Sequence, residues 1–196
     1  MADDRFERQL RFILEVDQLK QVLRRNYLIN GERRENSAEH SWHIVLAATI
    51  LAEYSDEPVD LRHVLKMLAV HDIVEIDAGD TFAYDVAGNA DKDTREQTAA
   101  DRIFGLLPDD QRDELRALWD EFEALVSPEA RFARAVDMLM PMLHNRYSGG
   151  RGWQENGVTS GQVLKRQIQI GAASGTLWEK AQAVVAEAVA LGYLSK

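Results

Sequence analysis

The stretch LRHVLKMLAVHDIVEIDAGD, residues 61–80, carries an apolar helical pattern into a cluster of acidic side chains. Its three leucines lie on one line of a helix with about 3.6 residues per turn, and the line continues to Asp72 and Glu75. Two further carboxylates follow, on Asp77 and Asp80. Carboxylates repel one another, and their burial is costly unless positive charge lies between them. The stretch therefore predicts a helix that delivers acidic groups to a cationic site.

Apolar residues recur with a helical period in nearly all of the chain, and no alternating strand pattern or internal repeat competes. Helices are expected over residues 4–23, from Ser37 as N-cap to Leu51, from Pro58 and Asp60 through 76, over 91–106, from Pro108, from Pro128 and over 159–191. Pro141 should kink or end its helix. Loops are expected near 25–36, over 77–91 and over 148–157. The sequence therefore predicts one all-α domain over residues 1–196, a single helical bundle.

The composition is that of a globular chain. Forty-five per cent of the 196 residues are hydrophobic, and no unbroken apolar run reaches the about 18 residues that suggest a membrane span. The first ten residues, MADDRFERQL, are charged and contain no apolar signal core. Cysteine is absent, which excludes disulfides and thiolate metal sites. We expect a cytoplasmic protein that does not bind a membrane.

The formal net charge of −10 disfavours binding to nucleic-acid polymers, whose phosphates require a basic surface. Positive charge is nevertheless concentrated in RRNYLINGERR, residues 24–34, which holds four of the 23 basic residues. This segment suits a small anionic ligand. A solvated loop of mixed charge is the alternative.

A lone carboxylate, Asp137, interrupts the apolar face of RFARAVDMLMPML, residues 131–143. Without a partner, a buried carboxylate protonates or destabilises the fold. Arg134 is one candidate partner, as an i,i+3 pair. A metal ion is the other.

Two histidines, His40 and His43, lie three residues apart in EHSWH, so one ion is able to take both. A single histidine on an apolar helix is usually a core residue, but here the indications accumulate. Three predicted helices supply candidate metal ligands, namely His40, His71, Asp72 and Asp137. Two neutral imidazoles and two carboxylates neutralise one divalent cation, and their nitrogen and oxygen donors suit Mn, Fe, Co, Ni or Zn.

The order of these motifs resembles the HD-domain metal-dependent phosphohydrolases. An isolated histidine in EHS is followed by an adjacent His-Asp pair in HDIVEIDAGD and a distant aspartate in AVDML. Together with LKQVLRRNYLINGERRENSAEHS, residues 19–41, they resemble the subgroup that contains bacterial 5′-deoxynucleotidases. The resemblance covers about residues 10–145, and the C-terminal helices over 159–191 carry no motif that it explains.

The resemblance implies an all-α fold of the HD type, often a homodimer, with one divalent metal ion per chain, for which Mg joins the metals above. It implies His40, His71, Asp72 and Asp137 as metal ligands. Glu75 is implied as the residue that handles the attacking water, and Asp80 as a second acidic site residue. Arg24 aligns with an arginine that faces the substrate phosphate. An aromatic residue follows that arginine in the subgroup, whereas Arg25 follows here, so the substrate preference does not follow from the resemblance.

The residues themselves suit phosphate-ester hydrolysis. Glu75 lies one turn beyond His71, near a metal-activated water, and its pKa should rise among like charges. Asp80, on a loop with glycine, is placed to orient water or the leaving oxygen, and Arg24 offers a bidentate fork for phosphate. Asp77 and Asp85 are expected to face solvent. His63 is expected at the surface, while for His144 a place beside the site and a structural role are equally open.

The activity expected from this resemblance is hydrolysis of a small-molecule nucleotide, a (deoxy)nucleoside 5′-monophosphate, by a metal-dependent 5′-nucleotidase. The runner-up is a related hydrolase acting on cyclic nucleotides or on nucleoside di- or triphosphates. A non-catalytic module that senses a nucleotide or a metal is a third reading, and Glu75 argues against it because binding alone needs no base. A structural bundle with buried ion pairs is the last, and it predicts no metal.

Overall fold

The computed structural model describes residues 2–85 and 87–196. The helices in these residues are α1 (Ala2–Val16), α2 (Ser37–Leu51), α3 (Leu61–Val70), α4 (Glu75–Ala78), α5 (Lys92–Phe104), α6 (Asp109–Ala124), α7 (Pro128–Tyr147), α8 (Arg151–Glu155), α9 (Ser160–Gln167) and α10 (Gly175–Ala190). Short 3₁₀ helices are η1 (Asp17–Gln21), η2 (Ala52–Tyr54) and η3 (Ile168–Ala172), and two strands are β1 (Leu23–Tyr27) and β2 (Arg34–Asn36). The predicted all-α class is confirmed.

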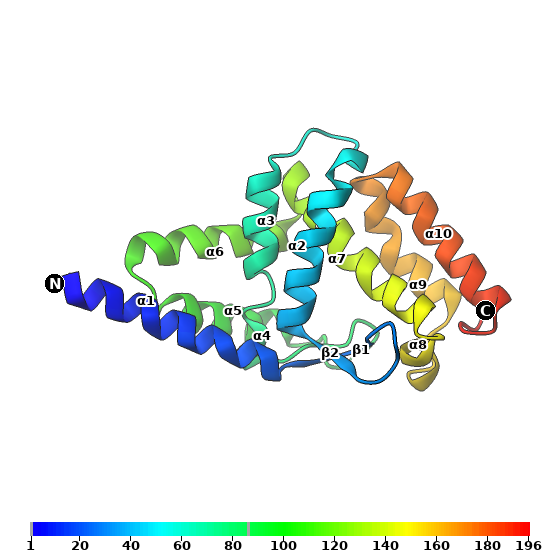
Figure 1. The fold of residues 1–196 in the computed structure, drawn as a ribbon, viewed down its shortest axis with the longest axis horizontal. Coiled ribbons are helices and arrows are strands. Elements are labelled where there is room, and N and C mark those ends of the chain that lie inside the picture. Colours follow the sequence, from blue (N-terminus) through cyan, green and yellow to red (C-terminus); the bar gives the residue numbers. More distant parts are fainter. Residues whose placement is uncertain (1, 86) are drawn as a thin grey trace.

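Helix α7 runs through the middle of the molecule and packs against α2, α3, α6 and α10 (Figure 1). Its buried face carries Phe132, Ala133 and Val136, which join one apolar core with residues such as Ile44 and Leu68. Helices α1, α5 and α6 lie on the side of the N-terminus, and α8 to α10 on the side of the C-terminus (Figure 1). The central helices thus form a rigid frame on which charged side chains are positioned.

The segment predicted as a loop near 25–36 forms a small antiparallel sheet, so the expectation that no strand is present was wrong. Strands β1 and β2 pair with Leu23 opposite Asn36 and Tyr27 opposite Arg34. Side chains alternate across a strand, and Arg24 in β1 and Glu35 in β2 are both buried. Arg24 therefore lies on a strand and not at the end of the first helix, which is already finished at Val16.

Helix α2 begins at Ser37, one residue earlier than a Ser37 cap would allow. The N-cap is Asn36, whose side chain accepts from the backbone N–H of Glu39, while the Glu39 side chain accepts from the backbone N–H of Asn36. This reciprocal capping box satisfies two N–H groups that the helix leaves free. Ser37 is consequently not the cap, and its hydroxyl is available to another partner.

The predicted continuous helix through residue 76 is interrupted. Of the two residues predicted to open this helix, Asp60 caps α3 by accepting from the N–H groups of Arg62 and His63, while Pro58 lies before it. The helix ends at Val70, and a tight turn follows in which Glu75 N donates to Asp72 O at 2.9 Å. Helix α4 then begins at Glu75, and Gly79, with φ of 73°, ends it. The interruption places His71 and Asp72 at the end of a helix, where both turn toward the interior.

Pro141 lies inside α7 without ending it, since the helix continues to Tyr147. The segment 148–157, predicted as a loop, contains α8, whose Trp153 is 3% exposed. In the described part of the chain, no helix is both long and apolar enough to cross a membrane.

Candidate active site

The four predicted metal ligands converge on one point between α2, the end of α3 and α7. His40 Nε2 lies 3.0 Å from Asp137 Oδ1, and His71 Nε2 lies 3.8 Å from the same oxygen. His71 Nε2 is also 3.0 Å from Asp72 Oδ1. His40 is fully buried, and the side chains of Asp72 and Asp137 are 12% and 14% exposed. The structure therefore brings all four together, although the sequence places them up to 97 residues apart.

The tautomer of His71 favours metal binding. Its Nδ1 lies 2.9 Å from the carbonyl oxygen of Leu68, which accepts a hydrogen bond from that nitrogen. In a neutral imidazole the lone pair is then on Nε2, the atom that faces the carboxylates. Nε2 is buried and has no hydrogen-bond partner among the described residues. A buried, orphaned nitrogen beside two carboxylates fits a divalent cation.

Electrostatics point to the same requirement for positive charge. Burial raises the pKa of Asp72, but His71 and Arg24 outweigh it and hold the pKa below its usual value. Burial likewise opposes the low pKa of Asp137, which His40 and His71 maintain. Burial lowers the pKa of His71, yet the two carboxylates raise it to about 10. Protons on the imidazoles thus supply charge that a divalent cation would supply instead.

Asp137 uses its two oxygens differently. Oδ1 faces His40 and His71, while Oδ2 accepts a hydrogen bond from Arg134 Nη1 at 3.4 Å. Arg134 is held in place by Glu123, at 2.8 Å, and by the Phe122 ring, whose centroid is 4.0 Å from the guanidinium carbon. The i,i+3 ion pair and the metal site are therefore compatible, because each uses its own oxygen.

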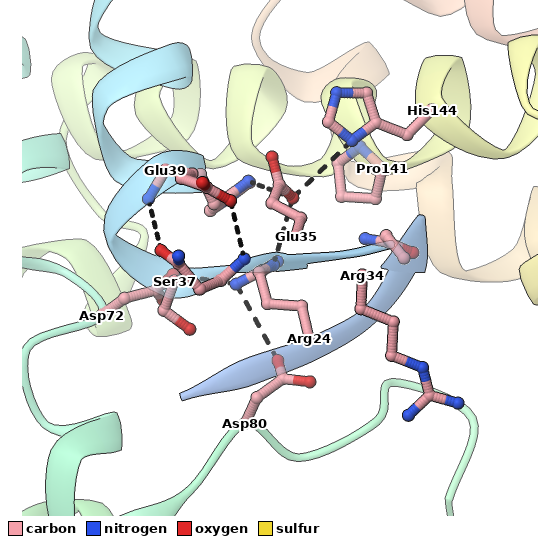
Figure 2. Close-up of polar contacts among 12 residues, drawn as sticks. Arg24, Arg34, Glu35, Ser37, Glu39, Asp72, Asp80, Pro141 and His144 are labelled. Carbon is pink, nitrogen blue, oxygen red and sulfur yellow. Dashed lines mark hydrogen bonds and ion pairs between the residues drawn. The ribbon is translucent and has the colours of Figure 1, made fainter. Parts of the chain in front are cut away.

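Arg24 lies directly beside this centre and lines its cavity. Its Nη1 donates to Asp72 Oδ2 at 2.8 Å and is 3.8 Å from Asp80 Oδ1. Figure 2 shows the guanidinium of Arg24 between Glu35 and Asp80. The residue is 9% exposed, and the carboxylates around it outweigh burial and raise its pKa. A permanently charged fork at this place suits a phosphate group.

Glu75 is buried at the start of α4, where Ser37 Oγ donates to its Oε2 at 2.6 Å. Burial, assisted by the nearby carboxylate of Asp72, raises the pKa of Glu75 well above its usual value. The expected rise among like charges is therefore found, with burial as the larger cause. Ser37 was missed as a site residue because its sequence position resembles an N-cap.

Asp80 follows the glycine that ends α4, and its side chain is 13% exposed. Burial, together with Asp72, raises the pKa of Asp80 despite the opposing charge of Arg24. Asp77 points away from the site and forms an ion pair with Arg102 at the surface. Asp85 accepts from the backbone N–H of Gly88 within its own exposed loop. Asp80 thus lies at the site while Asp77 and Asp85 lie outside it, as the sequence indicated.

A cavity of about 130 Å³ is lined by three of the candidate ligands, His71, Asp72 and Asp137, and a wider hollow of about 750 Å³ adjoins it. The walls of the cavity include aromatic and amide side chains, among them Phe82, Tyr84, Asn145, Trp153 and Gln167. Trp153 and Gln167 belong to α8 and α9. The C-terminal quarter, for which the sequence offered no role, therefore encloses the site.

The remaining histidines differ in how close they lie to the site. His63 is partly exposed and lies 2.7 Å from Glu121, away from the centre. His144 is buried, with Nδ1 3.6 Å from Glu35 Oε2, and its ring stacks on His43. His144 thus lies next to the site, on the side of Glu35. Glu35, which is 1% exposed, was missed because it was assigned to a polar loop.

Known proteins of similar sequence include enzymes that act on nucleotides. The chain is 33% identical over 129 residues to the 5'-deoxynucleotidase HDDC2 of Mus musculus, covering 65% of this chain and 63% of that protein. It is 33% identical over 134 residues to the HDDC2 enzyme of Danio rerio, covering 68% and 66%. The chain thus spans less than two thirds of the length of these curated relatives.

Solved structures share the fold. The crystal structure of a predicted metal-dependent phosphohydrolase from Magnetospirillum magnetotacticum MS-1 matches with a TM-score of 0.96 at 50% identity, covering 100% of this chain and 98% of that one. A conserved hypothetical protein from Pyrococcus furiosus shares the fold at 19% identity, with a TM-score of 0.65. The HD domain family model matches residues 16–178, which contain every predicted site residue. The chain therefore belongs to the HD domain family.

Proposed function

We propose that this protein is a metal-dependent phosphohydrolase that removes phosphate from (deoxy)nucleoside 5′-monophosphates. The convergence of His40, His71, Asp72 and Asp137 beside Arg24 carries the proposal. The four side chains would hold one divalent cation. That cation supplies Lewis acidity, which makes water more acidic and neutralises charge on phosphoryl oxygens.

Residues of the chain itself carry out the proton transfers and bind the phosphate. Glu75 accepts a proton from water as the water oxygen bonds to phosphorus, and the ester P–O bond breaks. The leaving oxygen takes a proton from Asp80, whose raised pKa keeps it a donor over a wider pH range. Ser37 orients the Glu75 carboxylate through its hydrogen bond. Arg24 holds the phosphate oxygens and loosens from Asp72 as it does so.

The size of the cavity supports a substrate with one phosphate and an organic group. The inner space of about 130 Å³, which His71, Asp72 and Asp137 line, suits the phosphoryl group. The nucleoside would extend past Phe82 and Tyr84 into the adjoining hollow of about 750 Å³. Aromatic faces at this passage offer stacking to a base.

We further propose that the protein is a homodimer. Side chains of α2 and η2 that are one turn apart form an exposed apolar row, namely Trp42, Leu46, Ile50 and Tyr54. Contiguous exposed apolar surface of this kind marks interaction sites. All four side chains are 40–68% exposed, so the row lies at the surface of the molecule.

The decisive experiment is a substrate panel. Phosphate release is measured from 5′-monophosphates, 3′-monophosphates, cyclic nucleotides and triphosphates, each with Mn²⁺, Co²⁺, Fe²⁺, Ni²⁺, Zn²⁺ or Mg²⁺. We expect 5′-monophosphates to have the highest kcat/KM. A preference for cyclic nucleotides or triphosphates would favour the related hydrolase instead, and nucleotide binding without turnover would favour a sensing module.

Arg24 variants complete the test. Arg24→Ala should raise KM and lower kcat/KM, and Arg24→Lys should recover only part of the loss because a point charge lacks the fork. Metal affinity should not fall, since a positive neighbour of the cation is removed. Arg62→Ala, on the exposed side of α3, is the matched control and should behave as wild type. Unchanged kinetics of Arg24→Ala would show that the phosphate is held elsewhere.

A further inference from the structure

Glu35 is the most completely buried carboxylate beside the site, and no step proposed above uses it. It lies in the middle of β2, immediately before the residue that caps α2. The strand pairing turns Glu35 and Arg24 of β1 toward the interior, while Leu23 and Arg25 face outward. An ionised glutamate is rarely buried unless it is paired. Its position therefore requires a structural explanation.

Four buried polar atoms that lack hydrogen-bond partners among the described residues face one another at this carboxylate. Glu35 Oε2 lies 3.5 Å from His40 Nδ1, 3.6 Å from His144 Nδ1 and 3.7 Å from Arg24 Nε. Figure 2 shows Glu35 between His144 and Arg24. Buried polar groups in proteins are nearly always paired. A shift of a few tenths of an ångström would bring the three nitrogens within hydrogen-bond distance of Glu35 Oε2. The four atoms are therefore each other's natural partners.

The two ends of His40 have different partners. Nε2 faces Asp137 and the centre shared by the candidate ligands. If this nitrogen binds a metal, the ring proton is on Nδ1, which points at Glu35. A carboxylate behind a metal-bound histidine fixes both the tautomer and the orientation of the ring. Arg24 is arranged similarly, with Nε toward Glu35 and Nη1 toward Asp72.

We propose that Glu35 is a positioning residue whose carboxylate holds His40 for metal binding and Arg24 for phosphate binding. One oxygen thereby couples the two ligand-binding parts of the site. The inference rests on the proposed function for the roles of His40 and Arg24. It assigns Glu35 no contact with substrate or metal.

A second metal ion is the competing explanation, because Glu35, His43 and His144 are close enough to share one. Two observations oppose it. Arg24 Nε lies 3.7 Å from Oε2 of the Glu35 carboxylate that the ion would use. The Nδ1 proton of His40 would point at the same oxygen from 3.5 Å. A cation there would meet positive charge on two sides.

The test compares Glu35→Gln with Glu35→Asp and with Glu155→Gln. Glutamine keeps the length of the side chain without its charge, and aspartate keeps the charge on a shorter chain. Glu155 is the control, since it accepts from Tyr27 of the same sheet but does not contact His40 or Arg24. Metal-free protein is titrated with Mn²⁺ by calorimetry, and nucleotide kinetics are then measured at saturating Mn²⁺.

We expect Glu35→Gln to weaken Mn²⁺ binding by about 10- to 100-fold. At saturating Mn²⁺ its KM should rise more than its kcat falls, because Arg24 is misplaced. Glu35→Asp should recover part of both losses, and Glu155→Gln should match wild type.

The inference would be overturned if Glu35→Gln only lowered the melting temperature and kept wild-type Mn²⁺ affinity and KM below its unfolding transition. Two Mn²⁺ ions per wild-type chain and one in Glu35→Gln would overturn it in favour of the second metal. If the wild type hydrolysed no nucleotide, the proposed function would fail, whereas weaker Mn²⁺ binding by Glu35→Gln would still support a positioning role toward His40.

Discussion

At the scale of the single residue, burial determines what Glu75 is able to do. A carboxylate acts as a base only when it is deprotonated, and burial and Asp72 raise the pKa of Glu75. We therefore expect kcat to fall as the pH drops through that raised pKa. Glu75→Gln should keep its metal, reduce turnover by roughly 10²- to 10⁴-fold and lose this acidic decline. Steady-state kinetics across pH, with metal content measured by elemental analysis, provide the test.

Asp77→Asn is the matched control for Glu75. Asp77 lies on the same helix but pairs with Arg102 at the surface, so its variant should keep both activity and metal. Loss of metal from Glu75→Gln would instead make Glu75 a ligand. Normal turnover by Glu75→Gln would move the base elsewhere, with Asp80 as the next candidate.

Single residues also show how far the sequence reaches. His71, Asp72 and Glu75 are predictable because one local helical pattern carries them. Ser37 and Glu35 were not, since the hydroxyl partner of Ser37 is 38 residues away and the burial of Glu35 depends on strand pairing. Local pattern identifies which residues are unusual, whereas contacts distant in sequence decide what an ordinary-looking residue does.

At the scale of the element, the small sheet is the feature that the sequence concealed. β1 and β2 contain five and three residues, too few for a period-2 pattern to stand out. The helices were predictable because their apolar stripes are long and their start signals, such as Asp60 and Pro128, are local. Where α3 stops was not, because its apolar pattern continues across the turn at 71–74.

Pro141 in α7 leads to a prediction about that helix. Proline has no N–H to donate, and its ring displaces the carbonyl four residues earlier, which belongs to Asp137. Pro141→Ala restores this bond, so we expect the free energy of unfolding to rise by about 1 kcal/mol. The same change should move the Asp137 side chain and weaken Mn²⁺ binding. Thermal denaturation of the metal-free protein and Mn²⁺ titration measure the two effects.

Pro128→Ala is the control for Pro141. Pro128 is the first residue of α7, where the absent N–H costs nothing, so its replacement should bring no gain in stability. A less stable Pro141→Ala protein, or one with unchanged Mn²⁺ affinity, would show that the proline does not shape the position of Asp137.

At the scale of the whole molecule, the site joins segments from most of the chain. The candidate ligands come from α2, the end of α3 and α7, while α8 and α9 close the cavity. We propose that these parts form one domain that unfolds in one transition. The C-terminal contribution was not predictable, because Trp153 and Gln167 have no local pattern that marks them as cavity residues.

Metal removal should affect stability as well as activity. An ion that binds only the folded state stabilises it by about 2.7 kcal/mol at a concentration of about 100 times its Kd. Chelation should therefore lower the melting temperature by roughly 5–10 °C for a chain of this size. It should also abolish hydrolysis, and scanning calorimetry with and without Mn²⁺ measures the shift.

Two histidine variants test the assignment of the ligands. His40→Ala should lose most of the Mn²⁺-dependent stabilisation, because Nε2 of His40 faces Asp137. His43→Ala should retain it, since the ring of His43 stacks on Trp42 and His144, and in the described residues it forms no ion pair with Asp72 or Asp137. The reverse result would mean that the wrong histidine of EHSWH was chosen, and activity in fully metal-free protein would refute the mechanism.

The apolar row on α2 and η2 sets the last prediction, which concerns the assembly. Leu46 and Ile50 of this row are 45% and 61% exposed. Two copies that bury this row remove apolar surface from water, whereas two glutamates in the row of each chain would bring like charges together in the interface. We expect the wild type to sediment as a dimer and Leu46→Glu/Ile50→Glu as a monomer that keeps its Mn²⁺ affinity. Val126→Glu, at an exposed apolar residue between α6 and α7, is the control and should remain dimeric. A wild type that is monomeric at every concentration, or a double variant that stays dimeric, would show by analytical ultracentrifugation that this row is not the interface.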